Sequence, residues 1–445
     1  MASLSKKLGS REIIQFLLLG CGSNAIFYIL FSRGSYYDAF TAAFNVTNTQ
    51  FGLMSTVALT ISMLTYFVGG ILADKVHPRM LVVISFIGTG LCNFFLGFFP
   101  NYGVTLCLYA IMGATTTLTF WGAFLKLTRQ FGRKVGSESK SFGAMEGTRS
   151  VFAIVAATFA VYMFSQFNNT VSGLRFVMWM YAGVLVLFGI MAFFAFKDDD
   201  ESAEDVINKE NPFKLLVQCI KDPNIWLIGI MAMGGYTVGS VIGSYMGTFG
   251  TSCFGISVAV AAYVGLLNQW CKPVGNFSVG FFGDKFGPSK VILFINICLT
   301  VIAAIYYFLP KNSTMVAVFI IIIIAEITLT GAFRGQMYAP MRQCRVPMNL
   351  SGSAIGFYAT LIYATDAILP IPIGQWLDNL PVEQAWGNIF LMLVVFGIIG
   401  IIASIVFMVR NKKVIAEVRA EEIAERAKRK TAQKTNTPVE TVTEE

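Results

Sequence analysis

Charged side chains are scarce in this sequence. Asp, Glu, Lys and Arg together make up 13% of the 445 residues, whereas 55% of the residues are hydrophobic. A typical soluble domain is about one quarter charged, so the composition excludes a soluble protein. Apolar runs take the place of the missing charge, and about twelve of them reach the ~20 residues that a transmembrane helix needs. The sequence therefore predicts an all-α membrane protein.

Sequence motifs for metal binding or catalysis are also absent. The eight cysteines are scattered singly without a C-x-x-C pair, and His77 is the only histidine. Neither a disulfide framework nor a zinc site is expected from this pattern. The sequence has no P-loop, no H-E-x-x-H motif and no nucleophile–base pair on a loop. We therefore expect no enzyme, no ATP-driven transport and no cofactor or metal.

The positions of the basic residues predict how the chain is oriented. The net charge is +8, but the charges flank apolar runs, which is typical of membrane proteins and not of nucleic-acid binding. Twenty-six Lys and Arg residues lie in loops on the side of the N-terminus, whereas the loops on the opposite side contain Lys311 alone. By the positive-inside rule, both termini are cytoplasmic and the number of spans is even.

One long polar interruption divides the apolar runs into two sets of six. We expect a cytoplasmic N-terminus at 1–11, a six-helix half at 12–196, a cytoplasmic loop at 197–223, a second six-helix half at 224–410 and a cytoplasmic tail at 411–445. The expected transmembrane helices are 12–40, 50–73, 80–99, 103–128, 143–166, 174–196, 224–249, 257–283, 289–309, 314–340, 350–377 and 386–410. The tail is predicted to be helical to about residue 430 and disordered beyond it. Its basic part is expected to lie against anionic lipid, with a partner site as the alternative.

A short charged hinge occurs twice in the chain. Gly70-Ile71-Leu72-Ala73-Asp74-Lys75-Val76-His77-Pro78 has the pattern G-x-x-x-D-K-x-x-P, which returns at Gly280–Pro288 with a spacing of 210 residues. Such a repeat indicates a duplicated domain. The first copy resembles the loop between helices 2 and 3 of the major facilitator superfamily of transporters, G-x-L-A-D-K/R-x-G-R-K/R, although Val76-His77-Pro78 stands where that family prefers a glycine. The resemblance implies twelve helices in two pseudo-symmetric six-helix halves, with a substrate site between them.

The resemblance also implies an inner gate at the two hinges. In the superfamily the hinge Asp faces the N-terminus of a helix in the opposite half, which carries partial positive charge and unpaired N–H groups. The expected helix starts near residues 350 and 141 are the candidate partners. The predicted gate residues are Asp74, Lys75, Arg79, Arg129, Asp284, Lys285 and Arg342. The alternative is that these residues act only as topology signals.

Ionisable residues at membrane depth are costly and mark a substrate pathway or a buried pair. Lys126, Arg175 and Asp38 lie near helix ends and are expected to reach an interface, whereas Glu146 and Arg149 are expected to pair on one helix face. The predicted substrate-binding residues are Arg33, Tyr36, Tyr37, Tyr236, Lys272 and Arg334.

Arg33 is the strongest of these candidates. A guanidinium offers a planar fork of donors that suits a carboxylate or phosphate, and Tyr36 and Tyr37 follow one turn later. This helix resembles that of the organophosphate:phosphate antiporter branch, typified by the glycerol-3-phosphate transporter, which implies an anion-binding role for Arg33. That branch has a second Arg in helix 7, whereas Gly234–Ser240 contains no base. We therefore expect an organic anion, with a structural ion pair between Arg33 and Asp38 or another acid as the alternative.

Two carboxyl groups are candidates for proton coupling. Glu326 lies in an apolar run, and Asp366 precedes Pro370 and Pro372, which are expected to bend or break their helix. Apolar surroundings favour the neutral form of a carboxyl, so either residue could carry a coupling proton. A fixed basic partner, such as Lys272 or Arg334, would argue against this role.

The sequence as a whole predicts a secondary active transporter that works by alternating access. We expect a monomer in the bacterial cytoplasmic (inner) membrane whose partners are a small-molecule substrate, the lipid bilayer and a coupling proton or counter-anion. Two alternatives stay open: a lipid or lysolipid flippase of the same fold, favoured by an apolar cavity, and a non-transporting membrane sensor that signals through the basic tail.

Overall fold

The structure, a computed structural model, describes residues 9–135, 138–196, 212–346 and 348–421. Within these ranges the secondary structure is helical throughout, apart from turns and short connections. The side chains of several residues at helix ends, including Asp74, Lys75 and Asp284, lie outside what the structure describes.

The N-terminal half is built from helices that follow the chain in order. They are α2 (Ser10–Tyr28), α3 (Arg33–Phe44), α4 (Asn48–Lys75), α5 (Pro78–Leu96), α6 (Tyr102–Ala114), the π-helix η1 (Thr115–Trp121), α7 (Gly122–Val135), α8 (Glu138–Ser165) and α9 (Thr170–Ala195). α6, η1 and α7 together form the fourth expected helix, and the π-helical turn falls in its middle.

The C-terminal half repeats this plan. It contains α10 (Pro212–Lys221), α11 (Pro223–Phe254), α12 (Val258–Phe286), α13 (Pro288–Phe308), the 3-10 turn η2 (Ser313–Met315), α14 (Val316–Gln336), α15 (Pro340–Gln343), α16 (Met348–Ile368), α17 (Pro370–Asn379) and α18 (Val382–Arg410). α10 lies within the expected loop 197–223, so part of that loop is a short helix.

Nine helices of the described ranges are long and apolar enough to cross a membrane. The bent pair of α2 and α3 makes a tenth span if it counts as one. The prediction of an all-helical membrane protein is confirmed. The count of twelve spans and the cytoplasmic position of both termini stay predictions.

Polar side chains fix where several helices begin. Thr47, Asn101, Asn169, Asp222 and Ser257 each accept a hydrogen bond from a backbone N–H in the first turn of the following helix. Such caps satisfy donors that have no partner within the helix. The long apolar segments between the caps then pack with close helix contacts, as transmembrane helices do where small residues face one another.

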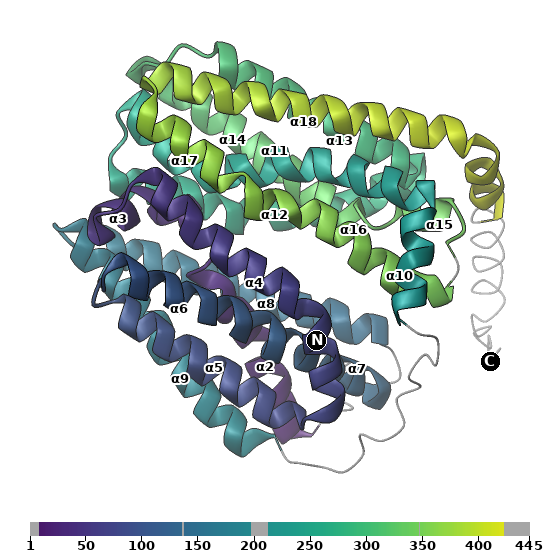
Figure 1. Cartoon of the computed structure of the whole chain (residues 1–445), viewed down its shortest axis with the longest axis horizontal. Coiled ribbons are helices and arrows are strands. Elements are labelled where there is room, and N and C mark those ends of the chain that lie inside the picture. Colours follow the sequence, from purple (N-terminus) through teal and green to yellow (C-terminus); the bar gives the residue numbers. More distant parts are fainter. Residues whose placement is uncertain (1–8, 136–137, 197–211, 347, 422–445) are drawn as a thin grey trace, which may run out of the picture.

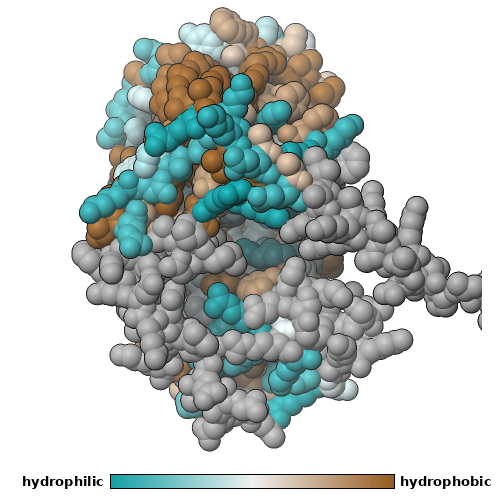
Figure 2. Space-filling model, turned by 90° about the vertical axis from the view of Figure 1, so that its right-hand side faces the viewer, coloured by the Kyte–Doolittle hydropathy of each residue, from teal (hydrophilic) through white to brown (hydrophobic). Residues whose placement is uncertain are grey.

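The two halves form two layers that meet most closely on one side of the molecule (Figure 1). On the side of α3 and α17, a Cβ atom on Gly34 would lie 2.4 Å from the carbonyl oxygen of Gly243 in α11, and one on Gly52 would lie 2.3 Å from that of Pro370. On the opposite side, which carries α10 and α15, the surface is hollowed between the halves (Figure 2). The molecule is thus closed on one face and hollowed on the other.

The tail contacts the C-terminal half. Residues 412–421 are helical, and Arg345 forms ion pairs with Glu417 (3.3 Å) and Glu421 (2.7 Å). Arg419 donates a hydrogen bond to the carbonyl oxygen of Lys285 at the end of α12, and Val418 is buried. The first part of the predicted tail helix is therefore present, and it is docked rather than free. The rest of the tail lies outside the described residues.

Candidate functional site

The first transmembrane helix is broken just before Arg33. α2 ends at Tyr28, α3 begins at Arg33, and the two are bent by 46°. Within the break, the Ser32 hydroxyl donates to the carbonyl oxygen of Ile29 at 2.8 Å, and Gly34 follows. Ser and Gly are common at sharp kinks because they help to satisfy or expose the freed backbone groups. The sequence predicted one helix at 12–40, and the structure corrects this to two.

The eleventh helix is interrupted at one residue, where the sequence predicted a bend or a break. α16 ends at Ile368 and α17 begins with Pro370, which has no N–H to donate to the helix. Leu369 between them keeps helical dihedral angles, and Phe357–Asn379 forms one span. Asp366 lies two residues before the end of α16, so it stands beside this interruption, whereas Arg33 stands beside the break of the first helix.

A cavity of about 50 Å³ is lined by both Arg33 and Asp366. Its lining comes from both halves and comprises Leu30, Phe31, Arg33, Ser55, Leu59, Ser240, Val241, Ser244, Tyr245, Thr365, Asp366, Leu369, Pro370 and Ile373. The cavity has one base, one acid, several hydroxyl groups and apolar walls. This mixture is typical of sites that bind small molecules, in which a few polar groups orient the ligand.

Arg33 is held by neutral groups. Its side chain is 8% exposed; Nη1 donates to the Tyr245 hydroxyl at 2.9 Å, and Nη2 donates to the Ser55 hydroxyl. The guanidinium also lies over the rings of Phe51 and Tyr245, at 5.1 Å and 5.2 Å. Among the residues whose side chains are described, none forms an ion pair with Arg33. The expected alternative pair with Asp38 is wrong, since Asp38 accepts hydrogen bonds from Thr248 and Thr251.

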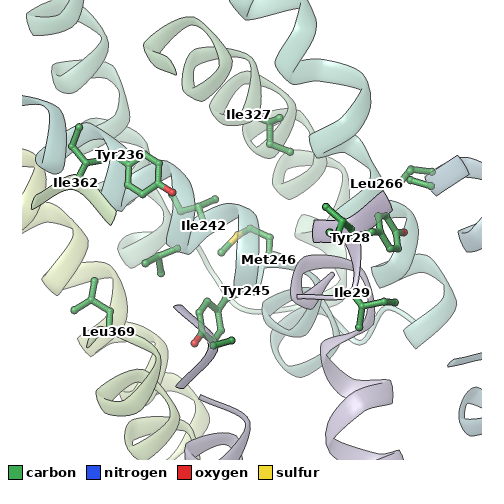
Figure 3. Packing of buried hydrophobic residues seen from close by; sticks show 14 of the residues in the cluster. Tyr28, Ile29, Tyr236, Ile242, Tyr245, Met246, Leu266, Ile327, Ile362 and Leu369 are labelled. Carbon is green, nitrogen blue, oxygen red and sulfur yellow. The ribbon is translucent and has the colours of Figure 1, made fainter. Parts of the chain in front are cut away.

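Asp366 is held by two hydroxyl groups on α11. Ser240 donates to Oδ1 and Tyr236 donates to Oδ2, each at 2.5 Å. The Tyr236 hydroxyl also accepts a hydrogen bond of 3.4 Å from Nη2 of Arg334, whose guanidinium lies 5.0 Å from the Tyr236 ring. Tyr236 and Tyr245 lie on the same helix, with Ile242 between them (Figure 3). One helix therefore contacts both the acid and the base of the cavity.

Glu326 and Lys272 lie deeper in the C-terminal half. Glu326 is 0% exposed; its Oε1 accepts from the Thr330 hydroxyl at 2.6 Å, and its Oε2 has no hydrogen-bond partner among the described atoms. Lys272 is half-buried on α12, where its backbone packs on Gly331 of α14. Its charge lies within electrostatic reach of Glu326, Arg334 and Asp366. The structure thus groups five of the predicted site residues in the C-terminal half: Tyr236, Lys272, Glu326, Arg334 and Asp366.

The two tyrosines after Arg33 have different surroundings. Tyr37 packs against Phe51 and Tyr245, with ring centroids 5.0 Å and 5.4 Å apart. Tyr36 turns away into the N-terminal half, where its hydroxyl lies 3.3 Å from that of Tyr28 and its ring packs on Phe164. Tyr36 itself has non-helical backbone angles within α3 (φ −130°, ψ 22°). Neither Tyr36 nor Tyr37 is among the residues that line the cavity.

Part of the predicted inner gate lies outside what the structure describes, namely the side chains of Asp74, Lys75 and Asp284. Arg79 lies over the ring of Phe193 at 4.4 Å, within its own half. Arg129 and Arg342 are exposed, and Lys285 lies beside the ring of Phe286 at 5.3 Å. The role of these residues in an inner gate stays a prediction.

Several residues of the site were not expected from the sequence. Ser55, Ser240 and Tyr245 contact Arg33 or Asp366, but hydroxyl residues are common in transmembrane helices and give no distinct signal. Asp378, at the end of α17, was also missed. Its carboxylate accepts four hydrogen bonds of 2.6–2.9 Å from the backbone and side chains of Asn48 and Thr49, at the start of α4. This contact joins the two halves on the closed face.

The sequence places the chain in a family. Residues 13–370 match the profile of the Major Facilitator Superfamily. The chain therefore belongs to this superfamily; it is a multi-pass membrane transporter and not an enzyme.

Particular relatives support this placement. Two inner membrane proteins of Escherichia coli (strain K12) are each 25% identical to the chain: YqcE, over 86% of this chain and 91% of YqcE, and YihN, over 91% of this chain and 97% of YihN. A bacterial homologue of the human lysosomal transporter Spinster, solved in an inward-facing and unoccupied conformation, has a similar fold, with a TM-score of 0.71 and 14% identity over 93% of this chain and 99% of that chain. The resemblance to the organophosphate branch is not supported by these comparisons and stays a prediction.

Proposed function

We propose that the protein is a secondary active transporter of a small organic anion, and that Arg33 binds the anion. The observation that carries this proposal is a buried guanidinium that lines a cavity between the halves and is held by hydroxyl groups. A buried charge without a counter-charge is unfavourable. An anionic substrate supplies the missing charge in the geometry that a guanidinium fork prefers.

The arrangement of the halves supports transport by alternating access. Hydrogen bonds between Asp378 and the start of α4, and between Asp38 and α11, join the halves on the closed face. The opposite face is hollowed (Figure 2). A rocking motion that opens the first face and closes the second would carry a ligand of the central cavity across the membrane. By the positive-inside rule the hollowed face is cytoplasmic, in a bacterial inner membrane such as that of the E. coli relatives.

Glu326 is the better of the two candidates for a coupling proton. It is fully buried, and one of its carboxyl oxygens has no partner among the described atoms. Lys272 lies within electrostatic reach, but no ion pair between Lys272 and Glu326 is found among the described residues, so Lys272 is not a fixed partner and the neutral form of Glu326 fits this surrounding. Asp366, in contrast, accepts two hydroxyl hydrogen bonds and is linked through Tyr236 to Arg334, which suits an ionised carboxylate. We therefore assign proton coupling to Glu326 and substrate contact to Asp366.

Ligand-dependent thermal stabilisation of the purified protein tests the proposal. A panel of carboxylates, sugar phosphates, sugars, nucleosides and lysolipids is compared on the wild type and on Arg33→Ala, followed by flux in proteoliposomes. We expect a carboxylate to raise the Tm of the wild type and not that of the variant, and a pH gradient to drive its uptake unless Glu326 is changed to Gln. Stabilisation by lysolipids alone, unchanged in Arg33→Ala, would overturn the proposal in favour of a flippase. Binding without flux would identify a sensor.

A further inference from the structure

A base and an acid line the cavity, Arg33 and Asp366. An acid group on the substrate accounts for Arg33 but leaves Asp366 without a ligand group. We infer that the transported anion also carries hydroxyl groups, as hydroxy acids and sugar acids do: its acid group binds Arg33, and a hydroxyl group donates to Asp366. This inference rests on the proposed function and names the substrate class for the same site.

Arg33 has donors left for a ligand. A guanidinium has five N–H donors, and the described contacts use one on Nη1 and one on Nη2, toward Tyr245 and Ser55. The remaining donors are enough for a bidentate contact with a carboxylate. These two hydroxyl contacts fix the orientation of the fork before the anion arrives, which lowers the entropy lost on binding.

Asp366 has acceptor sites left for a ligand. Ser240 and Tyr236 each donate to one carboxylate oxygen, whereas an ionised carboxylate offers about four lone-pair sites. The free sites belong to a group that lines the same cavity as Arg33. A substrate that reaches from Arg33 to Asp366 must place a hydrogen-bond donor at Asp366, because an apolar group there would leave the carboxylate without compensation for lost water.

The donor on the substrate is a neutral hydroxyl rather than an ammonium group. Tyr236 already links Asp366 to the guanidinium of Arg334 at 3.4 Å, and the charge of Lys272 lies within electrostatic reach. The charge of Asp366 is therefore balanced within the C-terminal half. A second cation would be repelled by these two bases, whereas a hydroxyl group gains a charge-assisted hydrogen bond without adding charge.

The remaining lining fits a polyhydroxylated carbon chain or ring. The hydroxyl group of Ser244 provides a further partner, whereas that of Thr365 donates to the carbonyl oxygen of Ile362 and accepts from Thr237. Phe31 also lines the cavity and is 55% exposed, although it lies in the first transmembrane helix. An aromatic face directed to a polar cavity can cover the C–H face of such a molecule, while the hydroxyl groups point to the opposite wall.

The experiment compares three compounds on the full-length protein: gluconate, which has an acid group and hydroxyl groups, hexanoate, which has the acid group alone, and glucose, which has hydroxyl groups alone. We expect gluconate to bind at least tenfold more tightly than hexanoate, since a site built for a hydroxyl group discriminates strongly against its absence. Thermal shift titration of the wild type, Asp366→Asn and Ser240→Ala measures this ratio. Ser278→Ala is the control, because Ser278 is exposed and bonds only within its own helix.

Each outcome is decisive. A ratio that falls toward one in Asp366→Asn or Ser240→Ala, with hexanoate binding retained, supports the inference; Ser240→Ala serves if Asp366→Asn fails to fold. Equal binding of gluconate and hexanoate to the wild type, both lost in Arg33→Ala, would overturn the hydroxyl contact and leave the proposed anion transport intact. Stabilisation by glucose and by neither acid would overturn the anion proposal itself. No shift with any of the three would overturn both.

Discussion

Arg33, beside the break in the first helix of the N-terminal half, and Tyr245, in the first long helix of the C-terminal half, contact each other directly. They are 212 residues apart, the Arg33 guanidinium donates to the Tyr245 hydroxyl at 2.9 Å, and the contact is buried. Asp38 repeats the relationship with Thr248 and Thr251, at separations of 210 and 213 residues. The first helices of the two halves thus meet through these contacts, in each of which a charged side chain is paired with a neutral hydroxyl group.

The first prediction distinguishes the role of Tyr245 in stability from the role of Arg33 in binding the anion. Tyr245→Phe keeps the ring under the guanidinium and removes one hydrogen bond to a charged group, which contributes about 1.5–3 kcal/mol. We expect a lower Tm but a retained thermal shift with the anion. Arg33→Gln removes the charge and is expected to abolish that shift. Thermal unfolding of both variants with and without the anion measures the difference. An anion-dependent shift that persists in Arg33→Gln would show that Arg33 is structural.

The second prediction concerns Asp378, which accepts hydrogen bonds from the first turn of α4 across the boundary between the halves. A carboxylate at a helix N-terminus is favoured by the partial positive charge there. Asp378→Asn removes the charge, and we expect the closed face to open more often. The readout is the rate at which an impermeant maleimide labels Ser244→Cys from that face, in a background without native cysteines.

We expect several-fold faster labelling in Asp378→Asn than in the parent. Asn379→Ala is the matched control, because the Asn379 amide bonds only to the carbonyl oxygen of Gln375 in its own helix. If the labelling rate of Asp378→Asn equals that of Asn379→Ala, the contact does not hold the closed face together.

The third prediction concerns glycine at the closed face. A Cβ on Gly34 would lie 2.4 Å from the carbonyl oxygen of Gly243, and a Cβ on Gly265 would lie 2.3 Å from that of Gly34. Gly34→Ala therefore pushes α3 away from α11, and we expect at least a tenfold loss of transport rate in proteoliposomes. Gly183→Ala, at a position where a Cβ would meet nothing within 4 Å, should transport like the wild type. Equal rates for the two variants would contradict the packing argument.

The fold could be predicted from the sequence because its signals are repeated and strong. The duplicated hinge with Asp74 and Asp284, the apolar runs and the unequal distribution of Lys and Arg all indicate two related helical halves. The break of the first helix could not be predicted with the same ease, because Ser32-Arg33-Gly34 carries no proline. The interruption before Pro370 was expected as a bend or a break, since proline removes a helical hydrogen bond.

The site was predicted only in part, for a physical reason. Arg33 and Asp366 were found because a charge at membrane depth is rare and costly. Tyr36 was expected beside Arg33 on the assumption of a straight helix, but α3 is irregular at Tyr36 itself (φ −130°, ψ 22°), and Tyr36 lies outside the cavity lining. Tyr245 and Ser240 gave no signal of their own, because their roles depend on which helix of the other half faces them.

The last prediction concerns the tail helix, which docks on the C-terminal half through Arg345. Its ion pairs with Glu417 and Glu421 are at the surface, and such pairs contribute about 1 kcal/mol or less each and weaken with salt. In the double variant Glu417→Gln/Glu421→Gln, we expect the backbone amides of residues 412–421 to exchange hydrogen several-fold faster than in the wild type. The variant Glu383→Gln, at the far end of α18, is the control. Protection that survives in the double variant and in high salt would mean that the buried Val418 holds the tail in place, and the ion pairs would then only orient it.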